Sequence, residues 1–341
     1  MEGGGFYNRH SAIQAAGIDL LSTLWRTACD TALLSHLPLT IVDYGSSQGR
    51  NSMTPIRDAI GVMRARQGAN VPIEVIHTDL PSNDFSALFQ ALEDEPNSYL
   101  SGLSGVYPAA IGRSFYEPLR PPESIHLGWS TWALQWMSRN PADAPDHILA
   151  GMSASPEVLS AVRRQQAADW RRFLELRANE MRSGAKLLLG FTASAPHENG
   201  WEWLLGQLWS SVADMGRDGV FSTDEQHRLT IPIGLRSLAE LEHPLRGSDR
   251  VQSLVVEHLE IRQVGDPFWE EFQRTQNRQA FAQSHADTTR AWAGPTITSR
   301  IDPARDRAGL VSELFTRFAR RVAANPRKHE PYMAVVLLTK S

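Results

Sequence analysis

Short runs of apolar residues recur along the chain and are separated by longer segments with helical periodicity. These runs occupy residues 39–44, 73–77, 124–130, 186–192, 254–261 and 332–338. Strands that are apolar almost throughout are typical of a sheet that helices cover on both faces. The pattern therefore predicts an α/β fold, and we expect the run at 332–338 to be an antiparallel strand that closes the sheet at its edge.

The clearest helical pattern covers residues 155–184. Ser155 can cap the helix, and Pro156 stands at the first helical position, where a missing N–H costs nothing. Gly184 is suited to a left-handed cap at the other end. One face of this helix carries Trp170, Phe173, Leu174, Arg177 and Met181, which follow the helical repeat.

This helix and the tryptophan-rich segment 201–209 interrupt the series of predicted strands. We interpret them as parts of a mostly helical cap that is inserted into the sheet domain and lies over its ligand-binding face. The predicted core consists of residues 1–140, 184–195 and 250–341, and the predicted cap of residues 141–183 and 196–249.

Composition excludes several classes of protein. The 341 residues carry a formal net charge of −4 with both signs scattered, so we expect no nucleic-acid partner. No apolar run approaches the ~18 residues of a membrane span, and no basic segment followed by an apolar stretch opens the chain. We therefore expect a cytoplasmic protein without membrane insertion. The single cysteine, Cys29, excludes an internal disulfide and a cysteine-based metal cluster.

A strand at 39–44 runs into a turn with glycines at 45 and 49, followed by a helix-like segment. Glycine lets the backbone turn sharply and approach a ligand closely. Asp43, at the end of the strand, suits a cationic amino group such as that of a methionine moiety. The spacing differs from the G-x-G-x-x-G pattern of dinucleotide-binding loops, which disfavours a diphosphate cofactor. A plain strand-to-helix turn is the alternative interpretation.

A second acidic residue, Asp79, follows the strand at 73–77. A carboxylate at the tip of the second strand can accept hydrogen bonds from both hydroxyls of a ribose. The alternative is that Asp79 only caps a turn before Pro81. Asp43 and Asp79 together, at two successive strand tips, favour a nucleoside-containing cofactor.

These residues lie in motifs that resemble the SABATH family of carboxyl methyltransferases and caffeine-type N-methyltransferases. The resemblance rests on FYNRHSAIQ at 6–14, DYGSSQGRN at 43–51, DLPSNDF at 79–85, SFY at 114–116, SIH at 124–126 and STWALQWMS at 130–138. Departures from the family pattern are His10 for Asn, Ser46 for Cys, Arg50 for Pro and Trp132 for Tyr. The last of these is expected to reshape the acceptor pocket.

The resemblance implies a Rossmann-like class I methyltransferase sheet of about seven strands, with S-adenosylmethionine as cofactor and a homodimeric assembly. It implies that Ser11, Asp43 and Asn51 hold the methionine part of the cofactor and that Gly45 also lies in the cofactor site. Asp79 would bind the ribose, Leu80 and Phe115 would sandwich the adenine, and Ser114 would fix its edge. Gln14 and Trp136 would donate to the acceptor carboxylate. The substrate pocket would further include Tyr7, Trp132, Gln135, Trp201 and Trp203.

This chemistry needs no general base, because a carboxylate is already ionised at neutral pH. The protein must align the two reactants and remove water from the nucleophile. Neutral donors such as Gln14 and Trp136 orient a carboxylate without the tight ion pair that would lower its nucleophilicity. The predicted acceptor is a small, largely apolar carboxylic acid, either a fatty acid or a benzoate-like or salicylate-like acid.

Each candidate also has a simpler structural interpretation. Trp136 and the cap tryptophans could be core aromatics, Gln14 a solvated helix residue, and His10 and His126 structural hydrogen-bonding groups rather than bases. At the level of function, the alternatives are N-methylation of a heterocycle and a non-catalytic cofactor-binding protein. A nicotinamide oxidoreductase is disfavoured by the glycine spacing.

Overall fold

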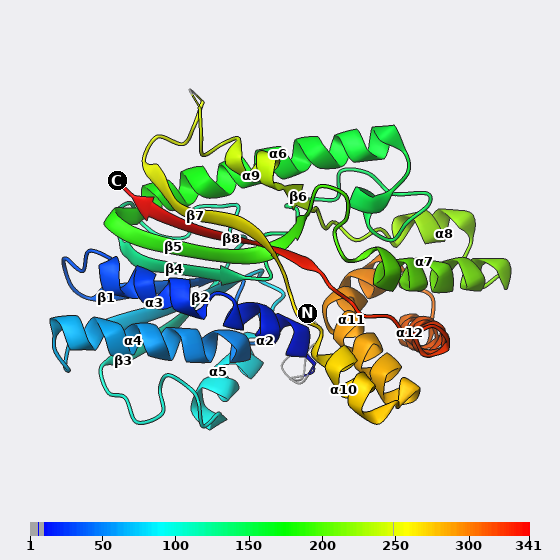
Figure 1. The fold of residues 1–341 in the computed structure, drawn as a ribbon, viewed down its shortest axis with the longest axis horizontal. Coiled ribbons are helices and arrows are strands. Elements are labelled where there is room, and N and C mark those ends of the chain that lie inside the picture. Colours follow the sequence, from blue (N-terminus) through cyan, green and yellow to red (C-terminus); the bar gives the residue numbers. More distant parts are fainter. Residues whose placement is uncertain (1–5, 7–9, 248) are drawn as a thin grey trace.

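The computed structural model describes residue 6, residues 10–247 and residues 249–341. Within these residues, eight strands form one mixed sheet (Figure 1). The strands are β1 (Leu39–Tyr44), β2 (Ile73–Asp79), β3 (Val106–Gly112), β4 (Ile125–Thr131), β5 (Met181–Ser194), β6 (Arg236–Ser237), β7 (Leu254–Gln263) and β8 (Tyr332–Lys340). Seven of them follow the order β3-β2-β1-β4-β5-β8-β7, and β6 pairs with β5. The expected α/β sheet of about seven strands is confirmed.

Strands β1 to β5 run parallel, whereas β8 is antiparallel to both of its neighbours, β5 and β7. The direction predicted for the last strand is therefore correct, but its place at the edge is wrong. β8 is buried from Met333 to Leu338, and this continuous burial requires a neighbour on each side. The half-exposed β7 forms the edge instead.

Strand β3 was not predicted from the sequence. Its residues 106–112 read VYPAAIG and are mostly half-exposed. Proline cannot donate a ladder hydrogen bond, so its presence argues against a central strand. It is tolerated in an edge strand, where the position of the missing N–H faces outward. β3 lies at the edge opposite β7.

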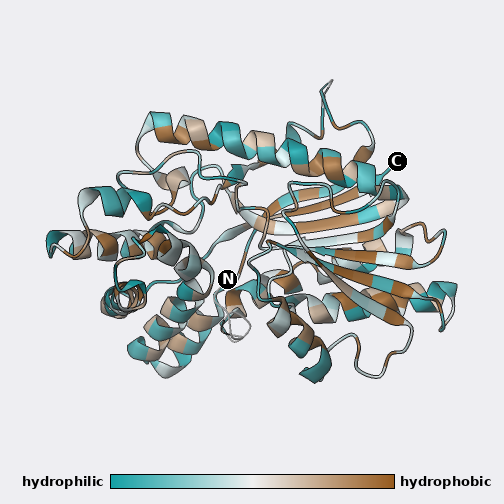
Figure 2. Ribbon diagram, turned by 180° about the vertical axis from the view of Figure 1, so that it is seen from behind, coloured by the Kyte–Doolittle hydropathy of each residue, from teal (hydrophilic) through white to brown (hydrophobic). Residues whose placement is uncertain are grey.

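Helices cover both faces of the sheet and also form a separate layer beside it (Figure 1). The helices are α2 (Ala12–Asp19), α3 (Ser22–Thr31), α4 (Met53–Gln67), α5 (Phe85–Asp94), α6 (Pro156–Glu180), α7 (Glu202–Arg217), α8 (Thr223–Arg228), α9 (Leu238–Glu242), α10 (Pro267–Thr275), α11 (Arg278–Arg300) and α12 (Arg307–Ala324), with short 3-10 turns η1 (Arg50–Ser52) and η2 (Ala150–Met152). Figure 2 shows the strands as the most hydrophobic part of the ribbon, as expected for a doubly covered sheet.

Helix α6 begins as predicted, with the Ser155 side chain accepting from the main-chain N–H of Val158 and Pro156 at its first position. It ends at Glu180, however, and Gly184 lies within β5 with a φ of +76°. The first half of the helix contacts η2, and its second half lies against the sheet. Trp170 and Phe173 belong to the apolar cluster that covers one face of the sheet, because their face of α6 matches the apolar side chains of the strands.

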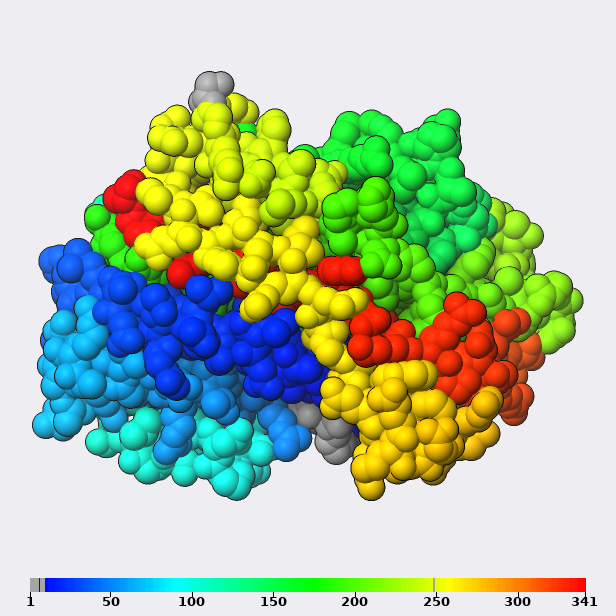
Figure 3. Space-filling model, viewed as in Figure 1, coloured from blue at the N-terminus to red at the C-terminus, as the bar shows by residue number. Residues whose placement is uncertain are grey.

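The helical layer beside the sheet consists instead of α7, α8, α10, α11 and α12 (Figure 1). α12 packs against both α7 and α11, and α10 packs against α11. The segment 267–324 was expected in the core, and the structure places it with α7 because these helices pack on one another. α2 contacts α10, so the N-terminal helix joins the two parts, and the blue and orange segments adjoin in Figure 3. No helix among the described residues combines the length and apolar character needed to cross a membrane.

Candidate active site

The glycine-containing turn after β1 lies where the strand order reverses, because β1 has β2 on one side and β4 on the other. Ligands of open α/β sheets bind at this switch point, beyond the carboxyl ends of the strands. Gly45 has a φ of +81°, and a Cβ added there would lie 2.4 Å from the Cβ of Ala133. The turn therefore requires glycine for both its conformation and its space.

Replacing Gly45 by alanine is expected to lower the free energy of unfolding by about 2–4 kcal/mol. The left-handed backbone costs a non-glycine residue about 1–2 kcal/mol, and the overlap with Ala133 adds roughly 1–3 kcal/mol of overpacking. Urea unfolding measures the change. Gly219 is the matched control, since its φ is +72° but a Cβ there meets nothing within 4 Å. Equal losses for both variants would contradict the steric argument.

Asp43 is buried at the end of β1. Its carboxylate has a hydrogen-bond partner that was not identified from the sequence. His77 lies beside it in the register of β1 and β2, and its Nδ1 is 3.1 Å from Oδ2 of Asp43. The Tyr99 hydroxyl lies 2.9 Å from Nε2 of His77. Burial raises the pKa of Tyr99, so its hydroxyl stays protonated and donates to the imidazole. The chain Tyr99–His77–Asp43 thus fixes the Asp43 carboxylate at the strand tip.

The Asp79 carboxylate is fixed by the backbone at the tip of β2. Its Oδ2 accepts from the main-chain N–H of Ser47 at 2.7 Å, and its Oδ1 accepts from that of Leu80 at 2.7 Å. Burial raises the pKa of Asp79, and the two N–H groups oppose that shift. The Leu80 side chain is 53% exposed, so an apolar surface next to this carboxylate is open to a flat ligand.

Asp79 and Leu80 line a cleft of about 220 Å³ together with other predicted cofactor residues, Gly45, Ser114 and Phe115. An adjoining hollow is lined by Asp43, Gly45 and Asn51. The Ser11 hydroxyl donates to the Asn51 side-chain oxygen at 3.1 Å, which ties the start of α2 to the turn. The structure therefore brings all of the predicted cofactor-binding residues to one edge of the sheet.

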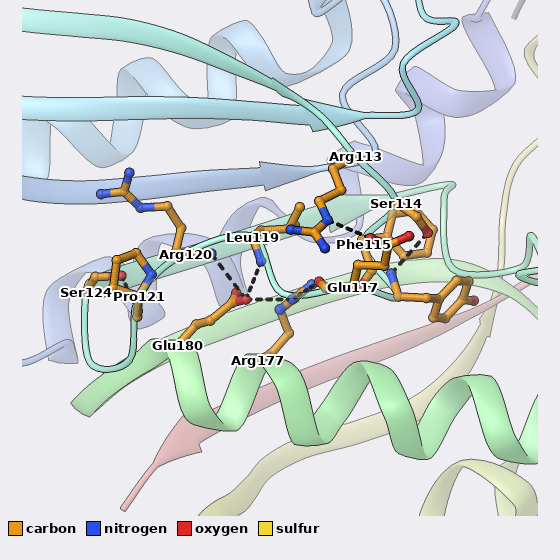
Figure 4. A network of polar contacts seen from close by, with 11 residues as sticks. Arg113, Ser114, Phe115, Glu117, Leu119, Arg120, Pro121, Ser124, Arg177 and Glu180 are labelled. Carbon is orange, nitrogen blue, oxygen red and sulfur yellow. Dashed lines mark hydrogen bonds and ion pairs between the residues drawn. The ribbon is translucent and has the colours of Figure 1, made fainter.

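The loop that carries Ser114 and Phe115 is held by a buried ion pair on α6 (Figure 4). The Arg177 guanidinium donates to the main-chain oxygens of Phe115 at 2.8 Å and Glu117 at 3.1 Å. It also donates to Oε1 of Glu180 at 3.0 Å, which in turn accepts from the main-chain N–H of Leu119 at 2.7 Å. Both charged side chains are almost completely buried. The pair fixes one wall of the cleft.

A second, largely apolar cavity adjoins the cleft. It is lined by Gln14, Trp132, Gln135, Trp136, Leu149, Thr192, Trp201, Leu205, Ile233, Leu235 and Trp292, and none of these described lining residues is charged. Trp132, Trp136 and Trp292 also line the cleft, so the cleft and the cavity share these indole walls. An acceptor in the cavity would therefore lie next to a ligand in the cleft.

Trp132 has a φ of +55°, a backbone conformation uncommon for non-glycine residues. Its indole N–H donates to the main-chain oxygen of Gln14 at 3.0 Å, which fixes α2 relative to β4. The Tyr116 hydroxyl donates to the main-chain oxygen of Trp136 at 2.7 Å and so holds this residue in place. Strained backbone of this kind recurs at ligand sites, where the surrounding structure over-determines it.

The cavity has a volume of about 30 Å³, which is room for about one water molecule. Its walls must therefore move before any organic acid enters. Trp292 on α11 has edge-to-face contacts with Trp136 at 6.4 Å and with Trp201 at 6.1 Å between ring centroids. This tryptophan was not singled out in the sequence, and neither was Thr192 on β5.

The structure distinguishes the two tryptophans at the start of α7. Trp201 lines the cavity, whereas Trp203 lies outside it, with its ring stacked on Phe281 and edge-on to His285. The sequence left open which of the two contacts the acceptor, and residues two apart at a helix start point in very different directions. Tyr7, also assigned to the pocket, lies outside the described residues.

The two histidines considered as bases line neither the cleft nor the cavity. His126 is buried, with Nδ1 accepting from the main-chain N–H of Thr40 at 3.0 Å and Nε2 donating to the main-chain oxygen of Ser35 at 2.6 Å. His10 donates through Nδ1 to the main-chain oxygen of Phe6 at 2.9 Å. Both are structural hydrogen-bonding groups.

Comparison with known proteins identifies the family. The family model described as SAM dependent carboxyl methyltransferase matches residues 2–341. The chain belongs to this family, the SABATH carboxyl methyltransferases. Its cofactor is S-adenosylmethionine, and the motif-based resemblance is thereby confirmed.

Curated relatives and a solved structure agree with this assignment. Anthranilate O-methyltransferase 2 of Zea mays is 26% identical over 98% of this chain and 94% of its own length. Indole-3-acetate O-methyltransferase 1 of Oryza sativa subsp. japonica is 28% identical over 85% of this chain and 77% of its own. A loganic acid methyltransferase solved with SAH superposes with a TM-score of 0.80 at 18% identity, covering 100% of this chain and 98% of that one, which shows the same fold.

The residues at the switch point fit this cofactor. The space that a Cβ at Gly45 would fill lies 3.5 Å from the Phe115 ring, so the glycine keeps open the passage between the turn and the cleft. The buried hydroxyls of Ser46 and Ser47 have no partner among the described residues and can bond to a bound ligand. The carboxylates of Asp43 and Asp79 are held in place by neighbouring groups, and carboxylate oxygens can accept hydrogen bonds from an ammonium group or a diol.

Proposed function

We propose that this chain esterifies the carboxylate of a small aromatic acid with the methyl group of S-adenosylmethionine. The observation that carries the proposal is the uncharged cavity beside the cofactor cleft, walled by the indoles of Trp132, Trp136, Trp201 and Trp292. Once these walls have moved apart to admit a ligand, their flat aromatic faces suit an aromatic ring better than a long flexible chain. The similarity to anthranilate and indole-3-acetate methyltransferases supports the same class of acceptor.

In this proposal the cofactor lies along the carboxyl ends of β1 and β2. Ser11, Asp43 and Asn51 receive its methionine part, and Gly45 leaves room for the backbone to approach. Asp79 accepts from the ribose hydroxyls, and Leu80 and Phe115 enclose the adenine beside Ser114. The common lining of the cleft by Gly45, Asp79, Leu80, Ser114 and Phe115 supports these roles.

Gln14 and Trp136 orient the acceptor carboxylate in the adjoining cavity. Within the part of the chain that the structure describes, the Gln14 side-chain oxygen is buried without a hydrogen-bond partner, so its amide has an unmet bonding requirement that a bound acid can satisfy. A half-turn of that amide presents its N–H groups to a carboxylate. The Trp136 indole supplies a further N–H from the wall shared with the cleft.

When bound, S-adenosylmethionine supplies a methyl group on a positively charged sulfur, which keeps the electron pair of the broken C–S bond as the new C–O bond forms. The protein needs to hold the carboxylate oxygen in line with that bond and to exclude water. Neutral donors orient the oxygen without neutralising it, and the closed indole walls remove its hydration. No proton is transferred, consistent with the structural roles of His10 and His126.

The test incubates the purified protein with S-adenosylmethionine and a panel of benzoic, phenylacetic, indoleacetic and medium-chain fatty acids, with xanthines as nitrogen acceptors. Mass spectrometry is expected to find methyl esters of the aromatic acids, with values of kcat/KM above those for fatty acids. Methylation of xanthines alone would favour the N-methyltransferase alternative. Cofactor binding without any methylated product would favour a non-catalytic role; a relative from Zea mays is itself named an inactive anthranilate O-methyltransferase. A homodimeric state and a cytoplasmic location stay predictions.

A further inference from the structure

One wall of the acceptor cavity comes from an extended segment that connects α8 to α9. This connecting segment, residues 231–237, ends in the two residues of β6, which pair with the end of β5 (Figure 1). Side chains along an extended chain alternate between two sides. Ile233 and Leu235 line the cavity. Gly234 and Arg236 lie on the opposite side, against helix α6.

Main-chain hydrogen bonds join the connecting segment to two other parts of the cavity wall. The N–H of Ile231 donates to the main-chain oxygen of Ile148 at 2.7 Å. The N–H of Gly234 donates to the main-chain oxygen of Gln135 at 2.9 Å, in the loop that also carries Trp136. Each of the three segments supplies residues to the lining of the cavity. This part of the wall is therefore one hydrogen-bonded unit.

Arg236 attaches that unit to the rest of the sheet domain. Its Nη1 donates to the main-chain oxygen of Leu134 at 2.7 Å, and its Nη2 donates to the main-chain oxygen of Gln166 on α6 at 3.2 Å. The guanidinium carbon lies 5.9 Å from the ring centroid of Trp170 on α6 and 5.9 Å from that of Phe191 on β5. One side chain thus links the cavity wall to α6 and to the sheet.

The burial of this cation calls for a physical reason. Arg236 is 1% exposed, and burying a charge is costly unless hydrogen bonds compensate it. Main-chain oxygens, rather than a carboxylate among the described residues, accept its hydrogen bonds. A planar guanidinium with five N–H donors can hold two separate main-chain oxygens at once, which an apolar side chain cannot do. The arrangement indicates that Arg236 fixes the relative position of two backbone segments.

We propose that Arg236 is a positioning residue for methyl transfer, which fixes the cavity wall carrying Trp136 and Ile233 relative to the sheet edge that binds the cofactor. The proposal rests on the proposed esterification. The carboxylate must meet the methyl group in line, and a misplacement of about 1 Å can cost on the order of 100-fold in rate. Arg236 is not among the described residues that line the cleft or the cavity, so it acts through the wall.

The first test compares Arg236→Met and Arg236→Lys with the wild-type protein. Initial rates at saturating S-adenosylmethionine give kcat and KM for the best acid, and calorimetric titration gives the cofactor affinity. In Arg236→Met we expect kcat to fall about 10–100-fold while cofactor affinity stays within about threefold of the wild-type value. Lysine keeps the charge and can donate to one of the two oxygens, so Arg236→Lys is expected to recover part of the lost kcat.

Arg177 supplies the matched reference, because it is the other buried arginine that donates to main-chain oxygens beside the site. It holds the loop with Phe115, which lines the cofactor cleft but not the acceptor cavity. Arg177→Met is therefore expected to lower cofactor affinity, the quantity that Arg236→Met leaves nearly unchanged. Opposite patterns in the two variants separate positioning of the acceptor wall from a general loss of packing.

A second test shifts the connecting segment without changing Arg236, and it decides the proposal if Arg236→Met does not fold. A Cβ added at Gly234 would lie 2.3 Å from Cδ of Gln166, so Gly234→Ala pushes the segment away from α6. We expect kcat to fall about tenfold or more in this variant. Adding Gln166→Ala removes the overlapping atoms and is expected to restore most of the activity. Gln166→Ala alone is expected to keep kcat near the wild-type value, because Arg236 bonds to the main chain of Gln166.

The outcomes separate this role from the function on which it rests. A folded Arg236→Met variant with wild-type kcat would overturn the proposal while leaving esterification in place. The same holds if Arg236→Lys is no more active than Arg236→Met, or if Arg236→Met loses as much cofactor affinity as Arg177→Met. A wild-type kcat in Gly234→Ala, or a loss that Gln166→Ala does not reverse, would also overturn it. A wild-type protein that binds the cofactor and forms no ester with any acid would overturn both proposals.

Discussion

Replacing Arg177 by methionine is expected to lower the free energy of unfolding by about 3–5 kcal/mol, the usual cost of leaving a buried charge without its partner. Glu180 would stay buried, and the main-chain oxygens of Phe115 and Glu117 would lose their donor. Because Phe115 lines the cofactor cleft, the affinity for S-adenosylmethionine is expected to fall about tenfold, or about 1.4 kcal/mol. Urea unfolding and calorimetric titration measure the two effects.

Arg171 is the control on the same helix. It is partly exposed and pairs with Glu175 at 3.7 Å and with Asp249 at 2.7 Å. Exposed pairs contribute about 0–1 kcal/mol, so Arg171→Met is expected to cost no more than that and to leave cofactor affinity near the wild-type value. The proposed role of Arg177 would be wrong if the two variants lost equal stability and affinity.

Substituting Trp136 by phenylalanine, or Gln14 by methionine, is expected to lower kcat/KM for ester formation by about 10–100-fold. Each change places an apolar side chain of related shape in the cavity wall and removes the N–H groups. The acceptor carboxylate then loses a hydrogen bond, and leaving such a buried group unpaired costs about 1–3 kcal/mol. The measurement is initial-rate kinetics with the best acid of the panel. Combining the two changes tests whether both donors act on one carboxylate, since the effects should then not simply add.

Trp269 provides the comparison for the tryptophan change. It packs against Phe272 and Phe281 on α10 and α11 and does not line the acceptor cavity. Trp269→Phe is expected to change kcat/KM by less than about twofold, because surface or peripheral changes have small effects. An equally large loss in this variant would mean that kinetics report on general packing rather than on carboxylate contacts.

Two residues on the cofactor side of the site, Asp43 and Asp79, could be predicted from the strand pattern of the sequence, whereas Ser11, Ser114 and Phe115 came only from the family resemblance. Asp43 lies near the end of one apolar run and Asp79 two residues after the next, and parallel strands bring their carboxyl ends to one edge. The partner of Asp43 could have been found in the same way. His77 lies in the second run at the position that pairs with Asp43, so the register alone links them.

The helices were harder to place, because periodicity shows that a helix has an apolar face but not what that face contacts. The face of α6 with Trp170 and Phe173 could pack on a sheet or within a cap, and the structure shows that it packs on the sheet. The choice between Trp201 and Trp203 stayed open since the sequence alone did not give the helix phase at the start of α7. Trp292 joins the cavity only through tertiary packing of α11 against residues far away in the chain.

The position of β8 between β5 and β7 determines when the sheet can close during synthesis of the chain. β7 pairs with β8, and the long β5 keeps an open edge until β8 arrives. A ribosome must therefore translate past residue 340 before the central apolar strand closes the sheet. Until then β5 and β7 expose unpaired edges, the kind of surface that chaperones bind and that drives misassembly. Completion of this sheet is thus expected to wait for a strand that is translated after all of the other described strands.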